Sequence, residues 1–190
     1  LYRITGDGNY LDLAHSFLEW RGDSTTHHLY GEYSQDHKPV VQQSEIVGHA
    51  VRAVYMYAGM TDVGVLRDDA PYLDAVGRIW TNMVDRKMYI TGGIGATHEG
   101  QAFGNDFQLP NRTAYGETCA AIGDVLWNVR LFQRTGDAVY MDVIERSLYN
   151  GLLAGISVDG TSFFYVNPLE ADSVHSFNMG ARSRRSWFDC

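Results

Sequence analysis

The sequence has 190 residues, 45% of them hydrophobic and 13% aromatic, which is enough apolar material for a packed core of ordinary domain size. Its formal charge of −8 at pH 7 repels nucleic-acid phosphates. The only basic cluster, Arg182, Arg184 and Arg185, is too short to follow a nucleic acid and predicts a solvated loop. No stretch approaches the roughly 18 apolar residues of a membrane-spanning helix. We therefore expect a globular protein with neither nucleic acid nor a membrane as partner.

The pattern Asp-x-x-Tyr-x-Asp occurs three times, beginning at Asp7, Asp69 and Asp137, and each copy opens a segment of helical period. The copies are 62 and 68 residues apart, about the length of two helices with their connections. This spacing predicts stacked helical hairpins.

Apolar residues recur at helical spacing over residues 47–58 and 122–132. Helix ends are predicted at Gly22, Gly59 and Gly136, and Pro71 suits the first turn of the helix that opens at Asp69. We predict an all-α fold with at least five helices. Six hairpins of about 65 residues each would form a closed ring, and this chain is long enough for only about half of them. Residues 1–190 are therefore interpreted as a partial α/α toroid, or (α/α)6 barrel, truncated at both ends.

Two stretches are not helical. Residues 91–100 contain four glycines but lack the lysine and the spacing of a phosphate-binding loop. Because they precede an aromatic loop at residues 103–110, this long connection is expected to have a function. Residues 156–158 and 161–165 flank Asp159-Gly160, which predicts a short β-hairpin with a two-residue turn.

Glu117 and Cys119 lie at the entry to a predicted helix, and zinc accepts both carboxylate and thiolate ligands. Shared ligation requires an irregular first turn, because residues two apart point to different sides of a regular helix. Gly116 could permit such a turn. The alternative is that Cys119 is a buried small hydrophobic residue and Glu117 a charge favoured by the helix dipole.

The other cysteine, Cys190, follows an aromatic segment at the end of the chain, which suggests that further residues of a cluster lie beyond it. Each of the two cysteines is either a buried thiol or part of a site. Two cysteines cannot form a disulfide framework, and free thiols favour the cytoplasm, although the compartment stays open because the chain begins without Met. His49, on the predicted helix 47–58, is either a core or surface histidine or a side chain that lines a polar ligand site.

Four short motifs together resemble glycoside hydrolase family 127, the beta-L-arabinofuranosidases, in the same order and over essentially the whole chain. The motifs are Val47-Gly48-His49-Ala50-Val51-Arg52-Ala53, Tyr89-Ile90-Thr91-Gly92-Gly93-Ile94-Gly95, Leu109-Pro110-Asn111 and Glu117-Thr118-Cys119-Ala120. The resemblance implies an α/α-toroid catalytic domain that hydrolyses beta-L-arabinofuranosides, or a related plant-glycan linkage, with retention. It further implies a cysteine thiolate nucleophile in a zinc site made from one Glu and three Cys, with a second Glu as acid/base.

Carried over to this chain, the resemblance places Glu117 and Cys119 at zinc positions and His49 at a substrate-contacting position. Cys190 is similar to the first cysteine of the family's Cys-x-Cys-Cys-Pro stretch. The nucleophile and a neighbouring zinc ligand are then expected beyond the chain, so the fragment is expected to be inactive and to bind zinc poorly.

One position departs from the family pattern. The acid/base Glu of the family lies in a Gly-Glu-Ala-Phe type of segment, where this chain has Gln101. Since an amide cannot transfer the proton, we expect either a slow or altered enzyme, or replacement by a nearby group such as Glu99, or a substrate with a better leaving group. Two alternatives to a glycosidase stay open: a glycan-binding pseudo-enzyme, and a sugar epimerase or lyase on a similar toroid.

Overall fold

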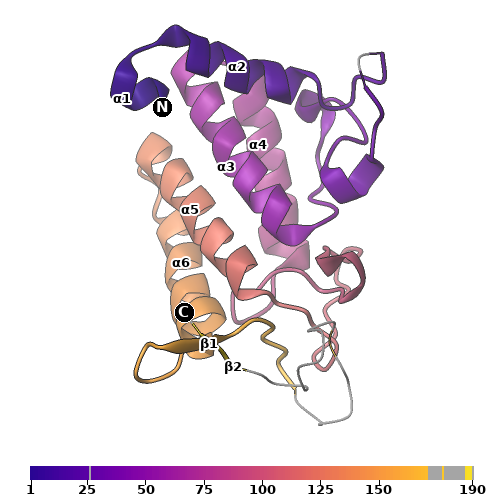
Figure 1. The fold of residues 1–190 in the computed structure, drawn as a ribbon, viewed down its shortest axis with the longest axis vertical. Coiled ribbons are helices and arrows are strands. Elements are labelled where there is room, and N and C mark those ends of the chain that lie inside the picture. The colour runs from indigo at the N-terminus through magenta and orange to yellow at the C-terminus, as the bar shows by residue number, and fades with distance from the viewer. Residues whose placement is uncertain (26, 171–176, 178–186, 190) are drawn as a thin grey trace.

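Two helical hairpins organise the computed structural model, which describes residues 1–25, 27–170, 177 and 187–189 (Figure 1). The first consists of α3 (Ala50–Arg67) and α4 (Ala70–Asn82), and the second of α5 (Thr118–Thr135) and α6 (Ala138–Arg146). The most extensive helix contact joins α3 to α5, so the hairpins lie side by side. The helices α1 (Tyr2–Thr5) and α2 (Gly8–Glu19) lie at the far end of α3.

Short helical and strand segments lie in the connections. They are η1 (Gly31–Ser34), η2 (Val40–Gln42), η3 (Met83–Lys87), η4 (Glu99–Gln101), η5 (Ser147–Leu152), η6 (Leu153–Gly155), β1 (Ser162–Phe164) and β2 (Trp187–Asp189). The segments η3 and η5 are π-helical and extend α4 and α6, and the others of the η series are 3-10 turns. The all-α fold class is confirmed, and paired hairpins are the unit that an α/α toroid repeats.

The repeated aspartates are helix N-caps. Asp7, Asp69 and Asp137 each precede a helix, and their carboxylates accept hydrogen bonds from the backbone N–H of the second or third helical residue. Such a cap satisfies an N–H that has no partner within the helix. Each of the three copies therefore marks the start of a helix, α2, α4 or α6, as predicted.

Helix boundaries agree with the sequence where the signal is local. Pro71 lies in the first turn of α4 and Gly136 ends α5 in the left-handed conformation. The prediction of a stop at Gly59 is wrong, because α3 continues through it to Arg67 and ends at Asp68. The helix α2 already ends at Glu19, and Gly22 lies in the turn that follows.

The predicted start of α3 at residue 47 is also wrong. The helix begins at Ala50, because Gly48 adopts φ +71° and His49 is extended as the N-cap. A Cβ on Gly48 would lie 2.0 Å from the carbonyl oxygen of Glu32, so the backbone of the preceding loop fixes this turn.

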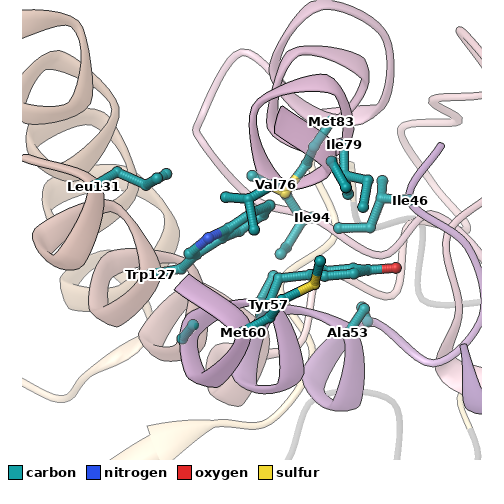
Figure 2. Packing of buried hydrophobic residues seen from close by; sticks show 14 of the residues in the cluster. Ile46, Ala53, Tyr57, Met60, Val76, Ile79, Met83, Ile94, Trp127 and Leu131 are labelled. Carbon is teal, nitrogen blue, oxygen red and sulfur yellow. The ribbon is translucent and has the colours of Figure 1, made fainter. Parts of the chain in front are cut away.

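The core lies between the hairpins. Figure 2 shows Trp127 of α5 reaching toward Tyr57 of α3, with Ile79 of α4 and Ile94 nearby, and all four are fully buried. Ile94 belongs to the segment 91–100, called here the glycine-rich loop. The rings of Tyr57 and Trp127 are 5.5 Å apart. The Trp127 indole N–H donates to Thr61 at 3.0 Å, so this polar atom keeps a partner inside the core.

The predicted hairpin at Asp159-Gly160 is only partly present. Its turn exists, because the Asp159 carboxylate accepts from Thr161 N–H, but it spans four residues between Ser157 and Ser162 instead of two. The residues before the turn contribute a single bridge, Ile156 to Phe163. The extended pairing of β1 is with β2, antiparallel and in register Phe163 to Phe188.

No helix of the described ranges is both long and apolar enough to cross a lipid bilayer.

Candidate functional site

The N-terminal ends of α3 and α5 lie at the same end of the molecule, where the long loops gather (Figure 1). The glycine-rich loop joins them. A Cβ on Gly95 would lie 3.1 Å from the Ala50 side chain at the start of α3, and the Gly95 carbonyl accepts from Gly116 N–H just before α5. Residues from three separate segments can therefore meet here.

His49 lies at the mouth of α3 as its N-cap and not on the helix surface. Its Nδ1 faces the backbone N–H of Arg52 at 3.5 Å, and its backbone pairs with Ala102 in an antiparallel bridge. Burial lowers the pKa of His49, while the nearby Glu117 carboxylate and a hydrogen bond with Gln101 oppose that shift. Both side chains are therefore near the imidazole.

Gln101 is presented by a strained turn. It has φ +51° and follows Gly100 at φ +68°, which turns the chain so that Ala102 can pair with both His49 and Thr97. The half-buried Gln101 side chain lies near His49 and raises the pKa of the imidazole against the effect of burial. Glu99 is exposed to solvent two residues earlier.

Glu117 is the N-cap of α5 and is almost completely buried, with 4% of its surface exposed. Its backbone is extended (φ −61°, ψ 133°) and bridges to Val166, because Gly116 turns the chain with φ +51°. The carboxylate oxygen Oε2 is buried and has no hydrogen-bond partner among the described residues. A buried carboxylate oxygen without a protein donor can be satisfied by a cation, a ligand or a water molecule.

Cys119 lies in the first turn of α5 with its thiol against the Glu117 carboxylate. Burial, and then hydrogen-bonding and Coulombic interactions with Glu117, raise the pKa of Cys119 to about 12. Because Glu117 is outside the helix and Cys119 inside it, the helical rule that separates residues two apart does not apply. The irregular entry that shared ligation requires is present.

Two tyrosines that sequence reasoning missed interact with Glu117 and Cys119. Tyr165 hydrogen-bonds Glu117, and burial followed by this contact raises its pKa. Tyr115 lies two residues before Glu117, and burial and the two neighbouring acidic groups raise its pKa to about 12. The His98 ring stacks on Tyr115 at 6.1 Å. The position of Tyr115 beside the Glu-x-Cys motif was a usable signal, whereas Tyr165 is distant in sequence.

The residues present supply two donors for a metal ion, one carboxylate and one thiol. Within the described ranges, no group of three or more His, Cys, Asp or Glu is close enough to hold a metal. Cys190 lies outside the described residues. The free Oε2 of Glu117 and the adjacent Cys119 sulfur fit one side of a zinc site, since zinc takes both ligand types.

The arrangement defines an α-helical domain of paired hairpins with a carboxylate–thiol pair that has histidine, amide and phenol groups as neighbours. A sequence model of the beta-L-arabinofuranosidase GH127 catalytic domain matches residues 1–190. The chain therefore belongs to glycoside hydrolase family 127.

Individual relatives agree. A non-reducing end beta-L-arabinofuranosidase of Bifidobacterium longum subsp. longum is 37% identical over 212 residues, covering 100% of this chain and 32% of that protein. A solved GH127 beta-arabinofuranosidase is 58% identical with a TM-score of 0.87, covering 93% of this chain and 27% of that one. The GH127 beta-L-arabinofuranosidase Ara127N-Se of Geobacillus stearothermophilus T6 is 43% identical with a TM-score of 0.85, covering 90% and 29%. The chain thus spans about a third of the length of the curated relative that it matches.

Proposed function

We propose that the full-length protein is a retaining glycosidase that acts on beta-L-arabinofuranosides and contains a zinc–cysteine site. The observation that carries the proposal is the buried Glu117 oxygen Oε2, which has no partner among the described residues, together with the Cys119 thiol beside the same carboxylate. Family membership and the activity for which the Bifidobacterium relative is named support the substrate class.

Glu117 and Cys119 are the residues of this chain that would hold the metal, with Cys190 as a further candidate. When bound, zinc would keep coordinating thiols ionised near neutral pH, where the metal-free Cys119 is a neutral thiol. Tyr165 would orient the Glu117 carboxylate through its hydrogen bond.

His49 and Gln101 would form the polar wall of the sugar pocket. A half-buried imidazole that is neutral near pH 7 can exchange a hydrogen bond with a sugar hydroxyl, and the Gln101 amide fixes its orientation. The amide cannot donate or accept the proton that leaving-group departure needs, so acid assistance is weak or comes from elsewhere.

The test is hydrolysis by zinc-loaded full-length protein of an aryl beta-L-arabinofuranoside and its alpha anomer, with the product anomer followed by NMR. We expect cleavage of the beta anomer only, initial release of beta-arabinose, and loss of activity in Glu117→Gln. Asp142→Asn, an exposed acid on α6, is the matched control. Inversion, or full activity in Glu117→Gln, would contradict the mechanism.

Gln101 favours a second candidate, a glycan-binding protein that retained the pocket and lost its acid. Calorimetric binding of arabinosides without turnover, in protein with zinc bound, would select this alternative. The epimerase or lyase alternative has no support from the family to which the chain belongs.

A further inference from the structure

Away from the pocket, a fully buried carboxyl group links α5 to the glycine-rich loop. Asp124 and Ser147 have no exposed surface. The Ser147 hydroxyl oxygen lies 2.8 Å from Asp124 Oδ2 and 3.1 Å from the carbonyl oxygen of Gly92. Both contacts require a hydrogen, and a serine hydroxyl has one to give.

The other side of Asp124 is fixed by Asn128. The Trp80 indole N–H can only donate, and it lies 2.8 Å from Asn128 Oδ1, so the Asn128 amide nitrogen faces Asp124. That nitrogen uses its two hydrogens on the Asp124 side-chain oxygen Oδ1, at 2.8 Å, and on the Asp124 backbone carbonyl, at 2.9 Å. Asp124 Oδ2 is therefore left for Ser147 alone.

Counting hydrogens decides between the two charge states. If Asp124 is ionised, Ser147 donates to it, and the Gly92 carbonyl, which receives no other hydrogen bond within the described part of the chain, is left unsatisfied in the interior. If Asp124 is neutral, its Oδ2–H donates to Ser147, whose hydroxyl then donates to Gly92. Only the neutral acid satisfies every buried group.

We propose that Asp124 is a positioning residue that acts as a neutral carboxylic acid, and that the relay Asp124 to Ser147 to Gly92 fixes the glycine-rich loop beneath the candidate site. Gly92 has φ +80°, and a Cβ there would lie 2.7 Å from Ser147, so loop and π-helix are in direct backbone contact. In the same loop, the Gly95 carbonyl accepts a hydrogen bond from the N–H of Gly116, the residue directly before Glu117.

The electrostatic surroundings support the neutral form. Burial raises the pKa of Asp124 to about 7 against opposing hydrogen bonds from Ser147 and Asn128, and no charged group contributes to the shift. The phenols of the neighbouring elements pack on indole rings: Tyr140 of α6 lies on Trp80 at 4.8 Å, and Tyr57 of α3 lies on Trp127. Of the cations nearby in the sequence, Arg130 pairs with Asp62 at 2.8 Å and Arg146 is exposed, so neither is buried beside Asp124.

Linkage gives the sign of the pH effect. Because the pKa of Asp124 is higher in the folded than in the unfolded chain, its stabilising contribution is complete below about pH 4 and is lost as pH rises toward 7. Asp124→Asn keeps a donor toward Ser147 and an acceptor toward Asn128 but cannot ionise. Its Tm relative to wild type should therefore rise from about pH 5 to about pH 7.5 and then level off.

The experiment uses full-length wild type, Asp124→Asn and the control Asp142→Asn, with Tm measured from pH 5 to 9 and infrared spectra at the two limits. We expect the carbonyl band of a buried neutral carboxylic acid in wild type and Asp142→Asn at pH 5, its loss at pH 9, and its absence in Asp124→Asn. No such band, or a Tm difference that is the same at every pH, would overturn the neutral acid. These readouts do not depend on catalysis, so they stand or fall apart from the proposed glycosidase activity.

The positioning part rests on the proposed function and has its own readout. Ser147→Ala removes the link to Gly92, so kcat should fall at least about tenfold at every pH, a loss comparable to misplacing a catalytic group. Asp124→Asn should keep wild-type kcat near pH 6 and lose less activity than wild type as pH rises to 8. Wild-type kcat in a folded Ser147→Ala protein would overturn the positioning role.

Discussion

The side chain of Gln101 lies close enough to the imidazole of His49 to raise its pKa, although the two residues are 52 positions apart. The backbone bridge between His49 and Ala102 imposes this contact. Gln101, which the resemblance places at the acid/base position of the family, is therefore next to His49 in the candidate site, so its substitution can be tested directly.

Gln101→Glu should raise turnover of arabinosides with poor leaving groups by at least about tenfold, because general acid–base assistance is typically worth about a hundred- to ten-thousand-fold. The expected gain in turnover is smaller than this range, because the side chains around Gln101 can have adapted to the amide. Activated aryl arabinosides need less acid and should gain less. Turnover of both substrate types by the zinc-loaded full-length protein measures the difference.

Glu99→Gln is the matched control for that measurement. If Gln101→Glu leaves both rates unchanged and Glu99→Gln loses activity, the exposed Glu99 already supplies the proton. If neither substitution changes turnover, this loop has no role in acid–base chemistry.

Glu117→Gln and Cys119→Ser should each lower the zinc content of the purified full-length protein well below one ion per chain. Each substitution removes one of the two donors that the pocket supplies, and removal of a ligand weakens a site built for three or four. Metal analysis after dialysis against a chelator, with Asp142→Asn as control, gives the occupancy. Stoichiometric zinc in both variants would show that the metal is elsewhere.

Gly48→Ala should destabilise the protein by at least about 3 kcal/mol, because a left-handed residue gains a Cβ that meets the Glu32 carbonyl at 2.0 Å. Gly136→Ala is the matched control: the same φ of +71° with nothing within 4 Å predicts a loss of about 1 kcal/mol. Urea unfolding of the two variants separates backbone strain from collision. Equal losses would mean that the loop can move away from Gly48 freely.

Asp69→Ala should cost about 1 kcal/mol of stability, because it removes the acceptor for the Tyr72 N–H at the start of α4. Asp74→Ala, an exposed aspartate on the same helix, should change the free energy of unfolding by less than about 0.5 kcal/mol. A similar midpoint for both variants in chemical unfolding would argue against the capping role of the repeat.

The sequence alone determined the parts of the fold that depend on neighbouring residues. Asp7, Asp69 and Asp137 cap their helices through contacts two or three residues away, and Pro71 and Gly136 act through their own backbone preferences. Four motifs were sufficient for the family, because their order and spacing together are far more specific than any one of them.

Only the tertiary structure decided what depends on packing between distant segments. The backbone of Glu32 packs so closely on Gly48 that no side chain fits there, and this contact sets the start of α3. The partner of β1 is a strand more than 20 residues away. The convergence of Glu117 and Cys119 follows from an extended N-cap that periodicity does not reveal. The contact of Tyr165 with Glu117 and the neutral state inferred for Asp124 depend on burial and on the number of available hydrogens, which are properties of the folded interior and not of any stretch of sequence.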